Sequence, residues 1–555
     1  MDLISELPDP ILQHILSFLP VKQIIQTTIL SKRWIHLWLT FPSFEFDKNF
    51  FHFESKLQNK RLHLINFVEH TLKQLKCLRK FKLHTDFPEA NSTVVVDRWI
   101  DYVLKGCVQE LEIVVTVENG KRYNLPQRVF ANQSLTVLTV GDCKLCPSLM
   151  DGYKLLSMKS VSLLGVFAED ETVKRLVSNC PFIQHIKLNS CLGLRSLWLC
   201  ETNELITMEV QNNSGLYEFG AKAINLQAFE FRGQFQPCCI NISSCKNLKT
   251  LKLSMVAITD DWFNRCFSEF PLLEILALSY CHMLERLRIS SSHLKKFILC
   301  GCESVTRVDI DAPCLSRLEF SGDVISFSLN APALSQADME LSPRIFDNPW
   351  VVKQIEFLAH FNHLKSLTLQ SQTGKSVIIP QELRETFGSP LYGVKHLKLK
   401  IIKPLFSPSL KDLVKALLWI APQPQTITIE SGFGKKILKV PIVARQSRST
   451  LLSFPIQMAQ NVLSSTLYHE LLFSSKVGDN TYELVSKEYV GSSNHNVNDN
   501  ENAFDVEMSS DPDVDITVEA LEVFEVDVSA HCVHRIELVN DHNLIATKVD
   551  SMFNV

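Results

Sequence analysis

Residues Leu273–Cys281 read LEILALSYC, and residues Leu294–Cys302 repeat the pattern as LKKFILCGC. Two more segments, Leu135–Cys143 and Ile183–Cys191, follow the same order. Each segment has apolar residues at positions 1, 4 and 6 and a cysteine at position 9. Apolar residues at alternate positions are typical of a short strand that buries one face. Because the unit recurs along the chain, the pattern predicts a stack of similar units rather than a single core.

The pattern L-x-x-L-x-L-x-x-C is the signature of leucine-rich repeats. Copies without the cysteine begin at Leu78, Leu111, Val161, Leu248, Leu364, Val394 and Ile427. We therefore expect an α/β fold in which a curved, right-handed solenoid with a parallel sheet runs from about residue 75 to about residue 430. Position 9 should lie buried where the chain turns away, and a cysteine is small enough to fit there.

The length of each repeat predicts what covers the convex side. The repeats that precede Cys180 and Pro271 are long enough to contain a helix. We expect helices there over residues 171–178 and 260–270. Between Leu284 and Leu341, strand starts are separated by 10, 11, 10, 10 and 9 residues. About ten residues cannot hold a strand, a helix and two turns. Each full coil in this region is therefore predicted to carry a strand on both faces.

The N-terminal stretch Leu7–Trp38, LPDPILQHILSFLPVKQIIQTTILSKRWIHLW, predicts three short helices. Asp9 is a suitable N-cap, with Pro10 at the first helical position. One apolar stripe is expected on the first helix, formed by Ile11, Ile15, Leu16 and Leu19. Ser31 should cap the third helix, which holds Trp34.

This bundle has more apolar surface than it can bury by itself. Three helices of about ten residues fall below the roughly 40 residues at which a domain usually needs outside help to fold. The apolar side chains therefore pack either on the following domain or on a partner protein, and the order of the residues favours the partner.

The segments Leu7-Pro8, Ile15-Leu16, Phe18 to Lys22 and Leu30 to Trp34 resemble the F-box motif, and the resemblance extends from Leu3 to about Phe46. It implies binding to the Skp-type adaptor of an SCF (Skp-cullin-F-box) ubiquitin ligase, and through the adaptor to a cullin. Carried over position by position, the adaptor-binding or bundle-forming residues would be Leu7, Pro8, Ile15, Leu16, Leu19, Pro20 and Trp34. Gln23 departs from the motif, which usually has Asp at the start of the second helix.

The solenoid region also resembles a family. The segments Val96–Ile100, Leu111–Ile113, Tyr123–Pro126 and Leu417–Glu430 look like those of plant F-box/LRR proteins, including members with a C-terminal FBD domain, which is absent or degenerate here. The resemblance implies a non-catalytic subunit that recruits a protein substrate, of unknown identity, for ubiquitination. Two alternatives are a receptor for a small hormone-like molecule and an interaction scaffold outside any ligase.

We expect four regions: an F-box at 1–46, a helical linker or cap at 47–76, the leucine-rich-repeat domain at 77–435, and an atypical C-terminal region at 436–555. No Lys or Arg occurs between Lys487 and Arg535, and residues 491–510 are rich in Asn, Ser and acidic residues. Such composition predicts local disorder. The alternating residues 515–528 suit a strand or a linear motif.

Composition excludes several functions. The net charge of −4 and the lack of a Lys/Arg run disfavour nucleic-acid binding. No apolar run is long enough for a membrane helix, and no signal segment is evident, so the cytoplasm or nucleus and free thiols are expected. Cys143 and Cys146 have C-x-x-C spacing without a second pair, so neither a metal nor a cofactor is expected. No catalytic motif occurs, and we expect no enzyme activity.

Overall fold

The structure is a computed structural model that describes residues 4, 6–27, 30–47, 58–74, 78–87, 93–117, 120–150, 152–200, 202–343, 346–403, 407–431 and 434–439. The predictions for residues 440–555, which include the disordered segment and the alternating segment, lie outside the described residues.

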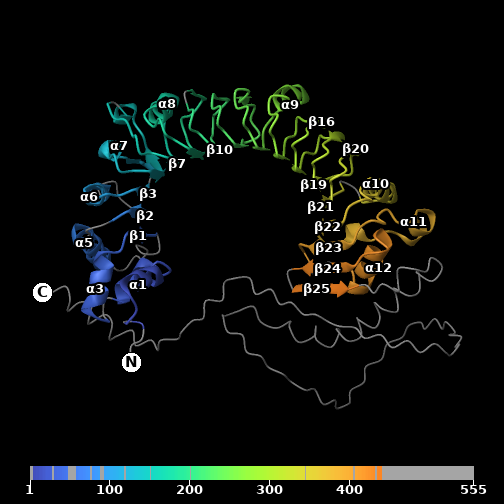
Figure 1. Cartoon of the computed structure of the whole chain (residues 1–555), viewed down its shortest axis with the longest axis horizontal. Coiled ribbons are helices and arrows are strands. Elements are labelled where there is room, and N and C mark those ends of the chain that lie inside the picture. The colour runs from blue at the N-terminus through green and yellow to red at the C-terminus, as the bar shows by residue number, and fades with distance from the viewer. Residues whose placement is uncertain are drawn as a thin grey trace, which may run out of the picture.

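The described chain forms an arch whose inner side is one 17-stranded sheet (Figure 1). All neighbouring strands pair in parallel except β24 and β25, which are antiparallel. In spatial order the strands are β1 (Ser43–Phe46), β2 (Lys80–Phe87), β3 (Glu110–Val117), β5 (Val137–Gly141), β7 (Ser160–Leu164), β8 (His185–Asn189), β10 (Thr207–Gln211), β12 (Ala228–Arg232), β14 (Thr250–Ser254), β15 (Ile275–Ser279), β17 (Lys296–Cys300), β19 (Arg317–Gly322), β21 (Gln336–Leu341), β22 (Ser366–Ser371), β23 (His396–Ile401), β24 (Thr426–Ser431) and β25 (Gly434–Lys439). The predicted parallel solenoid is confirmed.

The repeat positions explain the packing of the sheet. Leu251, Leu276 and Phe297 occupy position 4 of successive repeats and lie in register on β14, β15 and β17. All three side chains are buried, whereas the residues between positions 4 and 6 face the inside of the arch. Because successive side chains of a strand point to opposite faces, one face builds a continuous core and the other remains available to solvent.

Helices and short strands cover the convex side of the arch. The helices are α6 (Thr93–Leu104), α7 (Arg128–Ala131), α8 (Asp170–Ser178), α9 (Asp260–Phe267), α10 (Asn348–Ala359), α11 (Gln381–Thr386) and α12 (Leu410–Ile420), with 3-10 turns η3 (Pro147–Met150) and η4 (Lys375–Val377). Helices α8 and α9 match the two predicted helices closely, although α9 ends three residues early. Phe270 is buried in the turn that follows α9.

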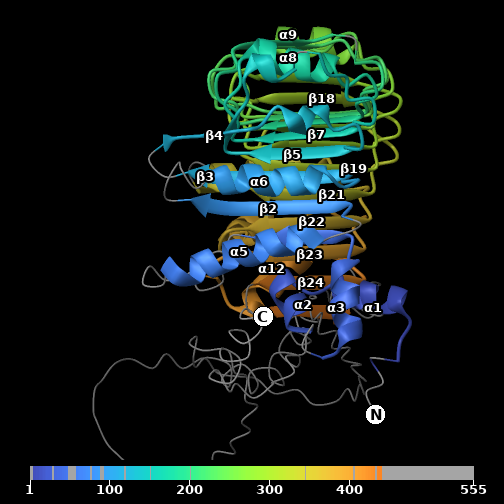
Figure 2. The same ribbon diagram turned by 90° about the vertical axis from the view of Figure 1, so that its left-hand side faces the viewer.

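Strands replace helices where the repeats are short. The strands β16 (Arg286–Ser290), β18 (Arg307–Asp311) and β20 (Ser326–Asn330) form a second parallel sheet opposite the main one, which confirms the prediction from the ten-residue spacing. A similar convex sheet of β9 (Ser196–Leu199), β11 (Glu218–Ala221) and β13 (Cys239–Asn241) was not predicted. The pair β4 (Tyr123–Asn124) and β6 (Cys143–Lys144) forms a separate two-stranded parallel sheet at the edge of the arch where the concave strands end (Figure 2).

An aspartate at the start of each of the helices α8 and α9 anchors the next coil. The Asp170 carboxylate accepts hydrogen bonds from the backbone N–H groups of Arg195 and Ser196, at 2.9 and 3.0 Å. Asp260 accepts the corresponding bonds from Glu285 and Arg286 at the same distances. The acidic residue that suits a helix N-terminus therefore also satisfies backbone donors at the edge of the convex sheet.

The cysteines at position 9 are buried, as predicted: Cys143, Cys191, Cys281 and Cys302. Asn213 occupies the equivalent position one coil after Cys191 and is also buried. Its side-chain oxygen accepts the N–H of Cys191 at 2.7 Å, and its amide nitrogen donates to the Leu188 carbonyl at 3.1 Å. The position is therefore a column of small side chains that satisfies backbone groups between coils.

The N-terminal bundle is continuous with the sheet. It consists of α1 (Asp9–Leu16), α2 (Val21–Thr27) and α3 (Lys32–Leu39), and the chain then enters β1, which pairs with β2. The first strand of the sheet thus lies inside the range 1–46. Helix α5 (Gln58–Gln74) occupies the predicted linker and lies beside α6 on the outer face of the N-terminal limb (Figures 1 and 2).

A row of aromatic rings joins the bundle core to the solenoid core. The Trp38 ring of α3 contacts Phe44 of β1 with centroids 4.5 Å apart. Phe44 lies 6.3 Å from Phe46, which in turn lies 6.0 Å from Phe81 of β2. Because these rings are buried, the bundle shares one core with the first coil, and part of its apolar surface packs on the following domain.

Candidate functional site

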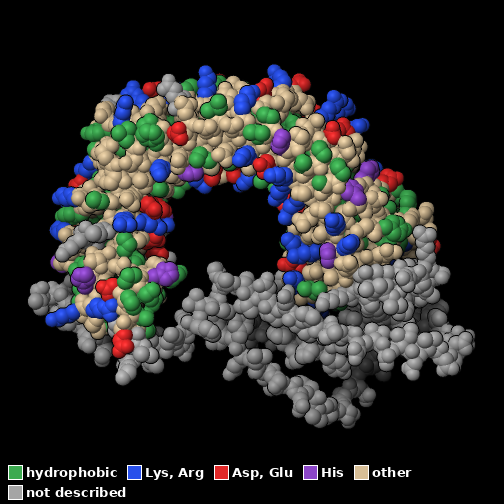
Figure 3. Space-filling model, viewed as in Figure 1, with side chains coloured by type: hydrophobic (Ala, Val, Ile, Leu, Met, Phe, Trp, Pro, Cys, Tyr) green, Lys and Arg blue, Asp and Glu red, His purple; other side chains and the backbone are tan. Residues whose placement is uncertain are grey.

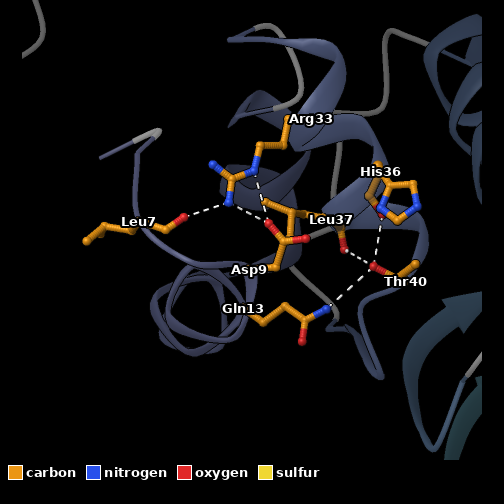
Figure 4. A network of polar contacts seen from close by, with 7 residues as sticks. All are labelled: Leu7, Asp9, Gln13, Arg33, His36, Leu37 and Thr40. Carbon is orange, nitrogen blue, oxygen red and sulfur yellow. Dashed lines mark hydrogen bonds and ion pairs between the residues drawn. The ribbon is translucent and has the colours of Figure 1, made fainter. Parts of the chain in front are cut away.

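Helix α1 begins one residue earlier than predicted. Its N-cap is Pro8, so the prediction that Asp9 caps the helix is wrong. The Asp9 carboxylate instead pairs with Arg33 of α3, at 2.5 Å from Nη2 and 3.0 Å from Nε (Figure 4). Arg33 Nη2 also donates to the Leu7 carbonyl at 2.6 Å. One guanidinium therefore ties the start of α1, with Leu7 and Pro8, to α3.

A second contact fixes the other end of this crossing. Thr40 Oγ1, just after α3, lies 3.0 Å from the His36 carbonyl, to which it donates. The Gln13 side-chain amide donates to the same hydroxyl at 3.4 Å (Figure 4). Side chains at both ends of the α1–α3 contact thus hold the two helices together.

Helix α1 carries two apolar stripes where the sequence predicts one. Leu12 and Leu16 are fully buried in the bundle core. Ile11 is 47% exposed, Ile15 37% and Phe18, in the turn after the helix, 74%. The single predicted stripe is therefore wrong, because Leu16 faces inward while Ile11 and Ile15 face solvent. Ile11, Ile15 and Phe18 stand at i, i+4 and i+7, which is also a helical spacing. This spacing could have predicted the second, exposed stripe from the sequence.

Further apolar side chains of the bundle are exposed at Leu30 and Ile35, by 62% and 38%. We call these five residues the outer set of the bundle: Ile11, Ile15, Phe18, Leu30 and Ile35. Except for Ile15, the proposed adaptor contacts did not include them. Five exposed aliphatic and aromatic residues on so small a body are candidates for an interaction surface.

The seven residues proposed from the sequence fall into three groups. Pro8, Ile15 and Pro20 are exposed. Leu7 and Leu19 are half-buried and pack against the core. Leu16 and Trp34 are buried in that core, with exposed fractions of 0% and 3%. The structure thus brings the first group to the surface and uses Leu16 and Trp34 to hold the helices together.

The inner side of the arch carries paired charges on neighbouring strands (Figure 3). Lys187 on β8 binds Glu209 on β10 at 2.6 Å, and these residues are partners in the strand register. Lys296 binds Glu319 at 2.8 Å. Because these pairs remain partly exposed, they add little to stability but give the concave face a charged, polar character.

The two limbs of the arch differ in charge. Glu45 and Glu112 lie on the inner side of the N-terminal limb, where Glu45 binds Lys80 at 2.6 Å. On the last strands, Lys398 forms a hydrogen bond with Glu430 that lowers the pKa of this carboxyl, and the charges of nearby lysines add to the effect. Acidic side chains therefore gather on the first limb and lysines on the last (Figure 3).

Two of the buried thiols at position 9 hold their protons firmly. Burial raises the pKa of Cys143 and Cys191 to about 12, so both thiols are neutral at ordinary pH. Among the described residues, no group of three or more His, Cys, Asp and Glu side chains could hold a metal ion. Within the same ranges, no helix is both long enough and apolar enough to cross a membrane.

Comparison with known proteins assigns both parts of the chain. Residues 4–46 match the F-box domain, and residues 69–243 and 233–403 match the LRR domain described as At1g61320/AtMIF1. The LRR match alone spans more than half of the chain. The protein belongs to the plant F-box/LRR-repeat family. The F-box is thus the α1–α3 bundle, and the LRR domain is the arch.

Similar F-box/LRR proteins occur in Arabidopsis thaliana. The chain is 28% identical to the F-box/LRR-repeat protein At3g18150 over 302 residues, which are 53% of this chain and 61% of that protein. It is 26% identical to the F-box/LRR-repeat protein At3g03360 over 353 residues, or 60% of this chain and 69% of that protein. It is 31% identical to the F-box/FBD/LRR-repeat protein At4g26350 over 195 residues, 34% of this chain and 42% of that protein. The chain thus spans less than two thirds of the first of these relatives.

Proposed function

We propose that this F-box/LRR protein is the substrate-recruiting subunit of an SCF ubiquitin ligase. Its F-box binds a Skp-type adaptor, which links it to a cullin, and its LRR arch binds a protein substrate. Catalysis belongs to other subunits, and the protein acts in the cytoplasm or nucleus. This proposal rests on the membership of the F-box/LRR family and on the outer set of the bundle.

The outer set is the observation that carries the proposal. Phe18 and Leu30 are mostly exposed, although exposing a large apolar side chain to water is unfavourable. The bundle core is already closed by Leu12, Leu16, Leu37 and the tryptophans, so the outer set is not required inside. We assign Ile15, Pro8 and Pro20, together with Phe18 and Leu30, to direct adaptor contact. Leu16 and Trp34 support that surface from the core, and Leu7 and Leu19 lie at its edge.

The rigid join between F-box and arch suits a recruiting subunit. Strand β1 leaves the F-box and pairs directly with β2, and Trp38, Phe44 and Phe46 fill the space between them. A substrate held by the arch would then keep a fixed orientation relative to the adaptor. Fixing the substrate near the ubiquitin-conjugating enzyme raises its effective concentration there, which is the contribution expected of such a subunit.

The charged concave face suits a protein substrate. Its cross-strand pairs, such as Arg317 with Asp338 at 2.6 Å, present both signs of charge to the inside of the arch. Complementary charge favours specificity and rapid association more than affinity. We therefore expect substrate binding on this face to weaken as salt concentration rises.

Co-purification of the full chain with a plant Skp-type adaptor tests the proposal. We expect binding by the wild type and loss of binding by the double variant Ile15→Ser, Phe18→Ser, with an unchanged melting temperature because both side chains are exposed. The matched control is Tyr392→Ser, which removes another mostly exposed aromatic residue, before β23, and should still bind.

Trp34→Ala is unsuitable for this test, because its loss would disturb the bundle core as well as any interface. If the folded wild type does not bind the adaptor, the ligase assignment fails and a scaffold outside the ligase takes its place. If the Ile15→Ser, Phe18→Ser variant binds the adaptor as strongly as the wild type, the outer set does not form the adaptor-binding surface.

A further inference from the structure

One backbone conformation recurs at the carboxyl ends of the concave strands. The residue directly after the strand has a positive φ in seven coils: Asp142, Gly165, Ser190, Asn212, Met255, Tyr280 and Gly301. Its N–H donates to the last strand residue of the next coil, as from Ser190 to the Gln211 carbonyl and from Tyr280 to the Cys300 carbonyl, both at 2.8 Å. Because this hydrogen-bond ladder fixes the backbone, the side chain at each position must tolerate a left-handed conformation.

Three neighbouring coils place large side chains in this conformation. Gly accepts a left-handed backbone at little cost and Asn and Asp at moderate cost, whereas bulky residues rarely adopt it. Met255 and Tyr280 have φ of 55°, and Phe235, in the loop after β12, has φ of 60°. Strained backbone of this kind is often found at binding sites.

These aromatic side chains are not needed for the core. Phe235 is 49% exposed and Tyr280 is 54% exposed. Burial therefore does not explain why such residues stand at positions where Asn or Gly would relieve the strain.

Two of these residues, Phe235 and Tyr280, lie with other exposed side chains on the edge of the arch. The Phe235 ring contacts His282 with centroids 5.8 Å apart, across the coil that contains β14. The Tyr280 ring lies over Gly301, where an added Cβ would come within 2.6 Å of it. Met283 is also about half exposed. We call Phe235, Tyr280, His282 and Met283 the edge patch.

A small recess, with room for about one water molecule, lies beneath the loop that carries Phe235. Val210, Leu216 and Phe231 line its apolar part, and Arg232, Gln234 and Gln236 line its polar part. Arg232 is exposed and makes no ion pair within the described ranges. Its neighbour Glu230 already accepts from Gln211 at 2.6 Å and from Lys252 at 3.3 Å. The recess is too small for a side chain, but its rim places the uncompensated Arg232 guanidinium next to the loop that carries Phe235.

We propose that the edge patch and Arg232 bind a peptide segment of a protein partner in which a large apolar side chain stands beside an acidic one. The apolar side chain packs against the exposed rings of Phe235 and Tyr280, and the carboxylate binds Arg232. Exposed aromatic residues and arginine are the side chains that most often dominate the binding energy of interfaces, and a guanidinium can bind a carboxylate through two hydrogen bonds. This inference rests on the proposed function, because the partner would be the recruited substrate.

The test pans a displayed library of random 12-residue peptides against the full chain, with and without a Skp-type adaptor. We expect enrichment of peptides that contain Phe, Tyr, Trp or Leu next to Asp or Glu. The affinity of an enriched synthetic peptide should fall at least tenfold for the double variant Phe235→Asn, Tyr280→Asn and for Arg232→Gln. The control Phe182→Asn removes an exposed aromatic residue that precedes β8, at the opposite ends of the strands, and should leave the affinity unchanged.

The asparagine variants also separate docking from a structural role. Asn tolerates a positive φ, so the Phe235→Asn, Tyr280→Asn protein should melt no lower than the wild type while losing the peptide. A lower melting temperature would mean that the aromatic residues are structural, and the proposal would fail. It would also fail if the library yields no enriched motif, if enriched peptides bind the variants normally, or if the variants abolish self-association of the chain instead.

Adaptor binding gives an independent readout. Ile15→Ser, Phe18→Ser should lose the adaptor and keep the peptide, because the F-box and the edge patch lie on different parts of the arch. Peptide binding without any adaptor binding by the wild type would therefore overturn the ligase assignment and leave the edge patch intact. Adaptor binding without peptide binding would refute only the proposal that the edge patch binds a peptide.

Discussion

Arg33 on α3 holds Asp9 on α1 through two hydrogen bonds of 2.5 and 3.0 Å, and the same guanidinium binds the Leu7 carbonyl. The F-box therefore depends on one side chain to fix the segment that precedes its first helix. Leu7 and Pro8 belong to the resemblance with the F-box motif, so this contact positions part of the proposed adaptor surface.

We expect Arg33→Met to lower the free energy of unfolding of the F-box by about 1–2 kcal/mol. The Arg33 and Asp9 side chains are 39% and 52% exposed, so their attraction is weak, and the lost bond to Leu7 adds the rest. Adaptor affinity should fall as well. Thermal unfolding and adaptor titration measure both effects. Lys32→Met, which removes the exposed neighbouring cation, is the control, and equal behaviour of the two variants would contradict the prediction.

Phe44→Ala should uncouple the F-box from the arch. Phe44 is fully buried between Trp38 and Phe46, and replacing such a residue by alanine costs about 3–5 kcal/mol. We expect limited proteolysis to release the F-box from the variant, with a lowered melting temperature. Phe18→Ser removes an exposed aromatic residue of the same bundle and should leave both unchanged. Protease resistance of Phe44→Ala at the wild-type level would rule out the shared core.

Asn213→Leu should destabilise the arch by about 2 kcal/mol. The substitution leaves the Cys191 N–H and the Leu188 carbonyl without their side-chain partner in a buried position. Chemical denaturation measures the change. Asn212→Gly alters the preceding residue, which has a positive φ that glycine accepts, and should be neutral. A neutral Asn213→Leu would show that the column of position-9 residues acts through packing alone.

The buried thiols should make the protein sensitive to alkaline pH. Burial raises the pKa of Cys191 from an ordinary value of about 9 to about 12 in the folded chain. The unfolded chain therefore releases this proton first, so stability present below pH 9 is lost as the pH rises toward 12. Each such thiol should lower the free energy of unfolding by up to about 1.4 kcal/mol for each pH unit between the two pKa values.

Unfolding free energies measured between pH 8 and 11 test this slope. Cys191→Ala should show a shallower decline than the wild type, whereas Cys314→Ala, at an exposed position, should follow the wild type. Iodoacetamide at pH 8 should also label Cys314 well before Cys191. Parallel slopes for all three proteins would exclude a contribution from the buried thiol.

The sequence predicted the elements whose signals are local and repeated. The L-x-x-L-x-L-x-x-C units gave the positions of the concave strands, because alternate burial in a strand imposes a two-residue period that repeats in every coil. The ten-residue spacing after Leu284 predicted the strands β16, β18 and β20 on the convex side. The strands β9, β11 and β13 were missed, although β8, β10, β12 and β14 begin only 21 or 22 residues apart, nearly the spacing of the coils after β15. The same argument from repeat length would have predicted them.

The candidate site was predicted less completely. The motif located the F-box, but its residue types did not separate the exposed Ile15 from the buried Leu16, which are adjacent in the sequence. Both are aliphatic and both fit a helical period, so only the crossing of α1 with α3 decides which one faces inward. Asp9 was likewise expected to cap α1, and its partner Arg33 lies 24 residues away.

By itself, the sequence determined the order of the domains, the register of the repeats and the burial of the position-9 cysteines, because each depends on spacing along a single strand or helix. Only the tertiary structure decided which bundle residues remain exposed, that β1 joins the F-box to the sheet, and that Phe235 meets His282 across an intervening coil. The physical reason is that these relationships arise between segments distant in the chain, where packing of coil on coil rather than local periodicity sets which side chains meet.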